Sequence, residues 1–448
     1  MKIITLLILL FFLSTNAFSQ TDNEKVYRSI AGAVKDSDNV KKLSLFNEAN
    51  LTLLPQQLLK LRNLEEISLD KCLKLNINQV IDVLSQLKHL RSFWFAQNGI
   101  PSLPKEIANL KNLQELGISD NELTELPVSL LKLKKLKKLY IGRNPNLNIP
   151  NLLDLLSKLD SLEELSLEDS GLSQIPEKIR ELRSLKDLDL SENEFTAIPA
   201  VIKKMSLTIV DFSMNNLEIL SIKKGDFPYL KTIDLNQNRL KKFPVSLSLI
   251  PNLHRIMLWG DSIVSIPKGI KRFKKLESIE LGYNQLSSIS DEITRLTRVK
   301  ELSLDGNRLT ATAIKPIFRM KWLTKLDLLN NKIAYLDPQI KKLTNLEELY
   351  VGANPIDKLP DEILSLKKLH NIGIGKLPHL NWDQTFSMLA QLPSLRTVSL
   401  YYEGFHKMPN GFEKLTHTTF FIMNGNDFDN KEEQKIIELF PLAKFEFN

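Results

Sequence analysis

The sequence is poor in the residues that usually carry covalent or metal chemistry. It contains a single cysteine, Cys72, so no intramolecular disulfide can form and the fold must be held together by packing. The motifs GxxxxGKS/T, GxSxG and HExxH, which mark phosphate loops, nucleophile elbows and zinc sites, do not occur. The six histidines are scattered, without cysteine or carboxylate neighbours at a metal-ligand spacing. We therefore assign no catalytic residue, no metal site and no cofactor, and predict that the protein is not an enzyme.

Long apolar runs are also scarce, and only the first residues contain one. Lys2 is followed by an almost unbroken apolar run over residues 3–13 and then by a small, polar segment with an Ala-x-Ser site. This pattern is typical of a secretory signal peptide, and the run is shorter than the roughly 20 apolar residues of a membrane span. We predict a signal peptide over residues 1–19, cleaved after Ser19, and a protein that is exported to the periplasm or secreted. No transmembrane segment is expected in the mature chain.

The sequence is rich, by contrast, in copies of one unit, which begins 17 times and most often repeats after 23 residues. Apolar residues at positions one, four and six, with polar residues between them, predict a short strand with one buried face. Position nine is asparagine in eleven of the units. The second half of the unit carries apolar residues at helical spacing, with proline where a helical turn would start. The units begin at Val40, Leu64, Leu90, Leu113, Leu136, Leu162, Leu185, Leu207, Leu230, Leu253, Leu276, Val299, Leu323, Leu346, Leu369, Leu395 and Thr418.

Stacking of these units is a physical necessity. One unit cannot bury its own leucines, so neighbouring units must pack together, with their strands parallel at about 4.8 Å per unit. A position-nine side chain such as that of Asn121 can then hydrogen-bond the backbone groups that a tight buried turn leaves unpaired.

These residues resemble the leucine-rich-repeat family, in particular its 23-residue class LxxLxLxxNxLxxLPxxIxxLxx, as in bacterial exported proteins and Ras-suppressor and Scribble-like scaffolds. The resemblance implies an α/β solenoid of about 17 repeats, an arc or horseshoe with a concave parallel β-sheet and a convex face of short helical turns. It also implies a protein-binding role, without indicating the partner. We expect a cap helix over residues 20–39, a solenoid over 40–429, and a cap helix and strand over 430–448, because terminal repeats would otherwise expose core.

Some units depart from this pattern. Cys72 lies at position nine, where the family accepts asparagine or cysteine, so we interpret it as a buried structural thiol. Three units are three residues longer and lead from position nine (Cys72, Asn144 and Leu377) into longer apolar stretches. We expect a full α-helical turn on the outer face of each, although an insertion in an outer loop would also fit.

Positions three, five, seven and eight of each unit are expected to face the hollow of the solenoid. Of these 68 positions, 17 are acidic and 7 are basic, in a chain whose net charge is +7. Nucleic acid is therefore not expected as the main ligand of the hollow. The lysines cluster at the seams between units, as in residues 132–138 and 271–275. They form either a solvated outer face or a contact surface for an anionic envelope or glycan.

Two groups of hollow-facing residues are candidate partner-binding residues. Asp189, Asp211 and Asp234 occupy position five of three consecutive units, where their carboxylates would repel one another. Such a column could await a basic partner or Ca²⁺, although aspartate is also common at this position of the repeat class. Aromatic residues are several-fold enriched at the hollow-facing positions, and they either bind a partner or decorate the strands. These aromatic residues are Trp94, Tyr140, Trp259, Tyr283, Tyr350, Tyr401 and Tyr402.

The sequence thus predicts an exported, non-enzymatic protein that recognises a protein partner through its concave sheet. A carbohydrate-binding or adhesin role is one alternative, because tyrosine and tryptophan platforms also stack on sugars. A structural envelope component held by its basic outer face is the other. The sequence leaves the oligomeric state open.

Overall fold

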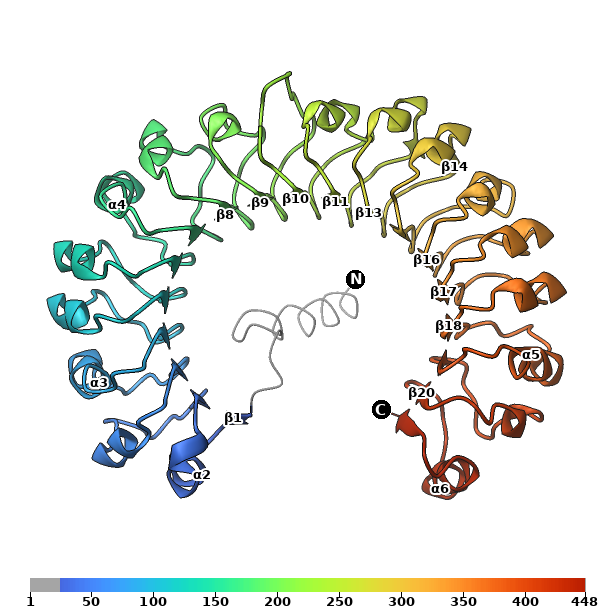
Figure 1. Ribbon diagram of the computed structural model, residues 1–448, viewed down its shortest axis with the longest axis horizontal. Helices are drawn as coiled ribbons and strands as arrows, with labels where there is room; N and C mark the ends of the chain where they lie inside the picture. Colours follow the sequence, from blue (N-terminus) through green and yellow to red (C-terminus); the bar gives the residue numbers. More distant parts are fainter. Residues whose placement is uncertain (1–24, 448) are drawn as a thin grey trace. The chain divides into compact units, whose positions relative to one another are not determined.

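The structure, a computed structural model, describes residues 25–447 and divides into two compact units. Unit 1 comprises residues 25–195 and 199–211, and unit 2 comprises residues 196–198 and 212–447. In each unit the strands lie side by side along the inner edge and the helices lie on the outer side (Figure 1). The predicted signal peptide, residues 1–19, falls outside the described residues.

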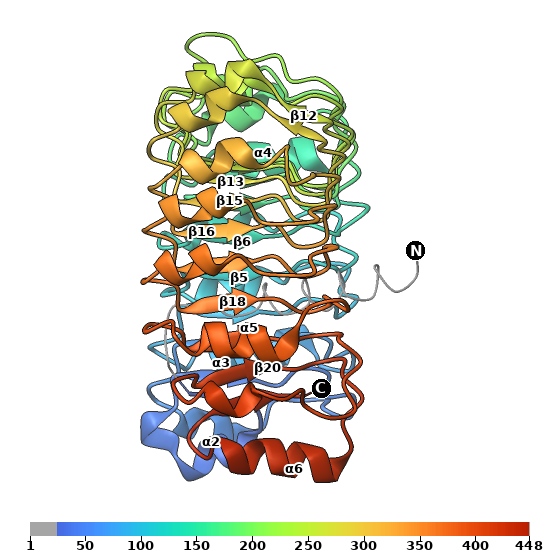
Figure 2. The same ribbon diagram turned by 90° about the vertical axis from the view of Figure 1, so that its right-hand side faces the viewer.

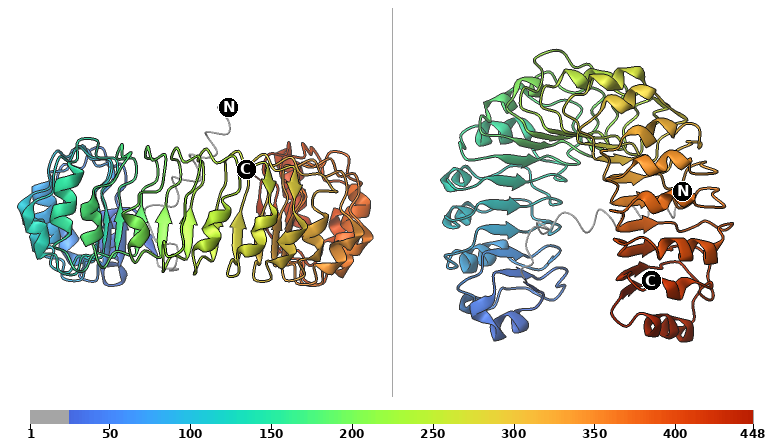
Figure 3. Two further views of the ribbon diagram at one scale, coloured as in Figure 1. Left: turned by 90° about the horizontal axis from the view of Figure 1, so that it is seen from above. Right: turned by 45° about the vertical axis from the view of Figure 1, so that its right-hand side comes forward.

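Unit 1 is built on one parallel sheet of short strands. From β2 onward, each strand covers positions three to five of its repeat and pairs in register with the next, as Lys42 does with Glu66. Figure 3 shows these strands stacked one above another (right panel, blue to green). The strands are β1 (Val26–Tyr27), β2 (Lys42–Ser44), β3 (Glu66–Ser68), β4 (Ser92–Trp94), β5 (Glu115–Gly117), β6 (Lys138–Tyr140), β7 (Glu164–Ser166), β8 (Asp187–Asp189) and β9 (Ile209–Asp211).

Unit 2 repeats this arrangement and adds a second, two-stranded sheet, β12 (Ser265–Ile266) with β14 (Ser288–Ile289). Its main sheet is also parallel and in register, as where Asp327 pairs with Tyr350. The strands of the main sheet are β10 (Thr232–Asp234), β11 (Arg255–Met257), β13 (Ser278–Glu280), β15 (Glu301–Ser303), β16 (Lys325–Asp327), β17 (Glu348–Tyr350), β18 (Asn371–Gly373), β19 (Thr397–Ser399), β20 (Phe420–Ile422) and β21 (Lys444–Glu446).

Most of the predicted helical turns are 3-10 helices. A proline usually stands one residue before the helix, and its carbonyl accepts the first hydrogen bond, as Pro55 does from Leu58 N at 3.0 Å. In unit 1 they are η1 (Ser37–Asn39), η2 (Gln56–Lys60), η3 (Lys105–Asn109), η4 (Val128–Lys132), η5 (Glu177–Glu181) and η6 (Ile202–Lys204). In unit 2 they are η7 (Val245–Leu249), η8 (Lys268–Arg272), η9 (Asp291–Arg295), η10 (Lys315–Arg319), η11 (Pro338–Lys342), η12 (Asp361–Ser365) and η13 (Phe412–Lys414).

The three longer repeats contain true α-helices, as predicted: α3 (Ile77–Leu84), α4 (Ile149–Leu156) and α5 (Trp382–Leu389). Each begins after an asparagine, Asn76, Asn148 or Asn381, whose side chain accepts a backbone N–H of the first turn. The extra three residues give room for a full α-helix, and the asparagine caps it.

A helix and a strand lie at the N-terminal end of unit 1, and another helix and strand lie at the C-terminal end of unit 2. In unit 1, α2 (Ile30–Lys35) lies in the segment where a cap helix was expected, and β1, which was not expected, precedes it and pairs with β2. In unit 2, α6 (Asn430–Leu439) lies at the end of the unit (Figure 2) and is followed by β21, which pairs with β20. No helix among residues 25–447 is long and apolar enough to cross a membrane.

A ladder of buried asparagines at position nine ties the repeats together. Asn121 Nδ2 donates to the carbonyls of Phe95, Ile118 and Ser119, at 3.0 to 3.1 Å. Cys72 takes the same place in its own repeat, where its buried thiol donates to Leu45 O at 2.9 Å. Burial raises the pKa of the Cys72 thiol, so the thiol stays protonated. The interpretation of Cys72 as a structural residue is confirmed.

Position eight has a left-handed backbone in every repeat, a feature that the sequence did not predict. The φ angles of its non-glycine residues lie between 45° and 62°. This conformation turns the chain directly after the strand and raises the energy of any residue other than glycine or asparagine. The non-glycine residues are Asn47, Lys71, Gln97, Asp120, Arg143, Asp169, Glu192, Met214, Gln237, Tyr283, Asn330, Ala353, Lys376 and Tyr402, and the glycines are Gly260, Gly306 and Gly425.

Candidate partner-binding surface

The predicted partner-binding residues all lie on a strand or on the turn directly after one. None of them is fully buried, and Tyr283 and Tyr402 are the most exposed of the aromatic residues, at 43% and 58%. The residues on strands are Trp94 in β4, Tyr140 in β6, Asp189 in β8, Asp211 in β9, Asp234 in β10 and Tyr350 in β17. The residues on turns are Trp259 after β11, Tyr283 after β13, and Tyr401 and Tyr402 after β19.

Two of the predicted aspartates, Asp189 and Asp211, are register partners in unit 1. The Asp189 carboxylate accepts hydrogen bonds from Ser166 Oγ at 2.7 Å and from both the N and Oγ of Ser191. Asp234, in unit 2, accepts from the backbone N and Nδ2 of Asn236. Over residues 25–447, no three histidine, cysteine or acidic side chains gather as they would around a metal ion. Neutral serine and asparagine groups of the protein thus hydrogen-bond the carboxylates of Asp189 and Asp234.

The aromatic pair of unit 1, Trp94 and Tyr140, stacks across the strand between them. Trp94, Gly117 and Tyr140 are register partners on β4, β5 and β6, and the two ring centroids are 4.9 Å apart. A Cβ atom on Gly117 would lie 2.1 Å from Trp94 Cε3. The absence of a side chain at Gly117 is therefore what lets the two rings meet on the strand face.

Hydrogen bonds tie these two rings to the carboxylates beside them. Trp94 Nε1 donates to Ser92 Oγ at 2.9 Å, and Ser92 Oγ donates to Glu115 at 3.0 Å. The hydroxyl of Tyr140 donates to Glu164 at 2.5 Å, and the Lys138 ammonium lies 3.0 Å from the other oxygen of Glu164. Burial, followed by the hydrogen bond to Glu164, raises the pKa of Tyr140. We call Trp94, Glu115, Lys138, Tyr140 and Glu164 the unit 1 cluster.

Arg143 forms the second charged network of unit 1. Its guanidinium lies 2.8 Å from both Glu168 and Glu192, and 3.8 Å from Asp169. Burial raises the pKa of Glu168 to about 7, although the positive charge of Arg143 acts in the opposite direction. Three carboxylates thus share one cation, whose Nε is buried without a hydrogen-bond partner.

Aromatic residues also lie over glycines in unit 2, in four cases with the glycine 23 residues downstream. A Cβ on Gly373 would lie 2.6 Å from Tyr350, and one on Gly425 would lie 2.3 Å from Tyr402. Trp259 covers Gly282 in the same way, and its ring centroid is 4.9 Å from that of Tyr283. This pairing was not predicted from the sequence, although the spacing of one repeat between aromatic residue and glycine was a signal for it.

Four residues of unit 2 form an acidic and aromatic region that we call the Asp–Tyr surface: Tyr283, Asp305, Asp327 and Tyr401. Asp305 accepts from Ser303 Oγ at 2.6 Å, and Asp327 accepts from Leu329 N at 3.0 Å. Burial raises the pKa of Asp327 to about 7, and the negative charge of Asp305 adds to this effect. The two aspartates belonged to the acidic hollow-facing set, but no feature of their repeats distinguished them from the other acidic residues.

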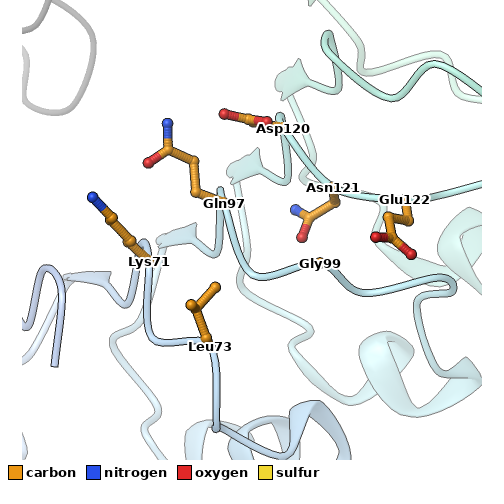
Figure 4. Close-up of a pocket in the computed structure, with 7 residues that line it drawn as sticks. All are labelled: Lys71, Leu73, Gln97, Gly99, Asp120, Asn121 and Glu122. Atoms are coloured by element: carbon orange, nitrogen blue, oxygen red, sulfur yellow. The ribbon is translucent and has the colours of Figure 1, made fainter. Parts of the chain in front are cut away.

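Unit 1 also has an open hollow of about 310 Å³ beside the turns that follow β3, β4 and β5 (Figure 4). Its lining mixes one ammonium, two carboxylates and amides, so it has no charge preference that would define a ligand. The lining residues are Lys71, Leu73, Gln97, Gly99, Asp120, Asn121 and Glu122.

Several seam lysines take part in the structure of the outer loops. Lys135, Lys275 and Lys368 each donate to an asparagine one repeat earlier in the chain, at 2.7 to 2.8 Å. These bonds give the seam lysines a structural role between repeats.

The comparisons with known proteins agree with this architecture. A family model described as "Leucine-rich repeat region" matches residues 39–170 and 212–437. The chain belongs to the leucine-rich repeat family. The predicted family and the predicted parallel-sheet solenoid are confirmed. Leucine-rich repeat proteins commonly bind proteins and are generally not enzymes.

Two solved leucine-rich repeat structures are similar to this one. A leucine-rich repeat protein of Leptospira interrogans is 29% identical with a TM-score of 0.56, and the alignment covers 94% of this chain and all of that one. An internalin of Listeria monocytogenes is 21% identical with a TM-score of 0.50, over 76% of this chain and 88% of that one. No curated protein matches the sequence.

Proposed function

We propose that the protein is an exported, non-enzymatic recognition protein that binds a protein partner through the strand faces of its repeats. The supporting observation is the repeated placement of a half-exposed aromatic ring over a glycine, as for Trp94 on Gly117 and Tyr350 on Gly373. Such rings offer a large contact area at a small cost in conformational entropy, because the neighbouring strand already holds them. The family supports this proposal, since its members commonly bind proteins.

The decisive experiment is a crosslinking pull-down with the purified protein and a triple alanine variant. Replacement of Trp94, Trp259 and Tyr350 by alanine should reduce capture of the partner at least tenfold, because these rings lie on the strand faces of both units. The matched control replaces Tyr229 and Tyr335, which are 56% and 45% exposed outside the strands, and should bind as the parent does. Equal capture by the parent and the triple variant would contradict the proposal.

A glycan array separates protein recognition from sugar recognition. We expect no strong sugar binding by the purified protein. Strong binding that is lost in Trp259→Ala would instead support the carbohydrate-binding alternative. Sedimentation with cell envelopes that salt reverses, without a discrete partner, would support the envelope component.

Export is a separate part of the proposal and has its own test. Expression of the full chain should yield a mature protein that begins at Gln20 and leaves the cytoplasm, whereas a chain without residues 1–19 should stay in the cytoplasm. N-terminal mass spectrometry of the two fractionated proteins checks this. An uncleaved cytoplasmic protein would contradict it.

A further inference from the structure

The Asp–Tyr surface of unit 2 lies next to two glycines of the strand face. Position-seven residues follow one another along the sheet, because the backbone N–H at position eight of each repeat donates to the position-seven carbonyl of the next. Such bonds join Tyr283 to Asp305, Gly306 to Leu329, Asn330 to Gly352 and Ala353 to Gly375, at 2.7 to 2.9 Å. In two consecutive repeats the position-seven residue is a glycine, Gly352 and Gly375, and has no side chain. Both glycines are buried by neighbouring residues.

Tyr283 and Tyr401 lean toward each other along the sheet. The Tyr283 ring lies over Gly306, one repeat later in the chain, where a Cβ would be 2.8 Å from its Cγ. The Tyr401 ring lies over Gly375, one repeat earlier, where a Cβ would be 3.0 Å from its Cδ1. The two phenols are close enough for Tyr283 to add to the rise in the pKa of Tyr401, of which burial is the main cause.

Two carboxylates, Asp305 and Asp327, lie beside these tyrosines, and Asp305 Oδ1 lies over Gly282, where a Cβ would be 2.3 Å away. Each contributes to the raised pKa of Tyr283 and of Tyr401, after the larger effect of burial, so all four groups share one neighbourhood. Lys325 is a basic residue beside them: its charge lowers the pKa of Asp327 against the larger effect of burial, and its ammonium lies 3.5 Å from Glu348. The hydrogen bonds that the two aspartates accept come from neutral groups, Ser303 Oγ and Leu329 N.

We propose that the Asp–Tyr surface binds a lysine or arginine side chain of the protein partner. This inference rests on the proposed function and names the chemistry of its central contact. Two carboxylates can accept charge-assisted hydrogen bonds from an ammonium or a guanidinium. Tyrosine rings attract a cation that approaches their faces. A partner cation would also give these two carboxylates a directly bonded positive charge, as Glu164 of the unit 1 cluster has in Lys138.

The size and charge of the surface favour a side chain over a metal ion. Ca²⁺ takes six to eight oxygen ligands, whereas this surface offers two carboxylates, and over residues 25–447 no group of three or more acidic, histidine or cysteine side chains gathers around a point.

Fluorescence anisotropy with a fluorescein-labelled hexa-arginine peptide tests the inference at pH 8, above the pKa of Asp327. The double variant Asp305→Asn/Asp327→Asn should bind the peptide at least tenfold more weakly than the parent. The matched control, Glu115→Gln/Glu164→Gln, removes the same charge beside the aromatic rings of unit 1 and should change binding less than threefold. Tyr401→Ala should weaken binding severalfold without any change in charge. Hexa-citrulline, a neutral peptide of similar shape, should not bind.

Equal weakening by the two double variants would overturn the inference, because it would show attraction by the whole acidic face rather than by this surface. Unchanged binding by Asp305→Asn/Asp327→Asn would also overturn it. The pull-down separates this inference from the proposed function. A partner that is lost with the aromatic triple variant but kept with Asp305→Asn/Asp327→Asn disproves the inference alone, whereas a partner kept with the triple variant disproves the proposed function. Urea unfolding of each variant confirms that it is folded.

Discussion

The strand faces of the two units use the same residue types in different ways. In unit 1, Glu164 accepts from Tyr140 and pairs with Lys138, and Arg143 lies among three carboxylates. In unit 2, Asp305 and Asp327 accept hydrogen bonds from neutral groups only. A cation bonded to a buried carboxylate offsets part of the cost of burying its charge, whereas a buried carboxylate without a bonded cation lowers stability in the absence of a ligand. Acidic residues at equivalent repeat positions therefore differ in how their charge is compensated. A basic partner would gain the most favourable charge interaction in unit 2.

The largest expected effect tests whether unit 2 contains a carboxylate that destabilises it. Asp261 stands at position nine, where the ladder asparagines donate hydrogen bonds, and its buried Oδ2 has no hydrogen-bond partner. Burial raises its pKa to about 7. Since the protonated form is the favoured one in the folded state, stability should fall as the pH rises from about 4 through 7. Asp261→Asn should raise the free energy of unfolding at pH 8 by about 3–4 kcal/mol, as measured by urea unfolding.

A matched substitution in the same unit provides the control for this experiment. Asn238 donates to the carbonyls of Phe212, Leu235 and Asn236, so Asn238→Asp should lower stability at pH 8 and do so less at pH 5. A pH-independent effect of Asp261→Asn would show that its carboxyl group is not the cause.

The next effect tests whether the Arg143 network stabilises unit 1. Arg143→Met should lower the free energy of unfolding by about 2 kcal/mol, because Glu168 and Glu192 lose their charged donor. Arg255→Met is the comparison in unit 2, where the Arg255 side chain is 47% exposed beside Glu280, and it should cost less than about 1 kcal/mol. Equal losses in the two variants, measured by urea unfolding, would remove the distinction between the units.

Removal of one carboxylate charge is expected to have a smaller effect on the free energy of unfolding, with opposite signs in the two units. At pH 8, Asp327→Asn should raise the free energy of unfolding by about 1 kcal/mol, because burial disfavours its charge. Glu164→Gln in unit 1 should lower it by about 1 kcal/mol, because the acceptor of the Tyr140 hydroxyl loses its charge. Thermal unfolding of the two variants in the same buffer checks the signs. Destabilisation by both substitutions would mean that contacts other than its hydrogen bonds stabilise the charge of Asp327.

The smallest expected effect concerns the aromatic rings themselves. Gly117→Ala should displace Trp94 from Tyr140 and cost about 1 kcal/mol or less, because the ring can move outward into solvent. The tryptophan region of the near-UV circular dichroism spectrum should change. Gly373→Ala, which acts on Tyr350, should leave that region unaltered. An unchanged spectrum for Gly117→Ala would mean that the glycine is not what permits the stacking.

Periodicity predicted the parts of the fold that depend on burial. The strands, the asparagine ladder, the structural role of Cys72 and the three α-helices all follow from apolar spacing and hydrogen-bonding capacity, which are local and repeat 17 times. The type of helix was predicted less well, because apolar spacing over five residues, as in Gln56–Lys60, fits an α-helical turn as well as a 3-10 helix. Strand β1 was missed because two residues carry no periodic pattern.

The details of the candidate site were less accessible to sequence analysis. The ten partner-binding residues remain predictions, although each lies on a strand or the turn after it. Asp305 and Asp327 look like other acidic residues until the neighbouring repeats show that no cation bonds them. That environment depends on residues about 23 to 100 positions away, such as Tyr401, and a single repeat does not contain it.

The left-handed residue that ends each strand also shapes how this array can change. Fourteen of the 17 turns hold a side chain in a conformation that glycine would adopt more easily, so the array stores energy of about 1 kcal/mol at many of them. Replacement of such a residue by glycine would relieve the backbone strain in one repeat and leave its strand unchanged. Residues such as Arg143 and Tyr283 thus adopt this backbone conformation at a local cost in stability. At each of these turns, one repeat at a time, a substitution can therefore exchange local stability for a different side chain on the surface.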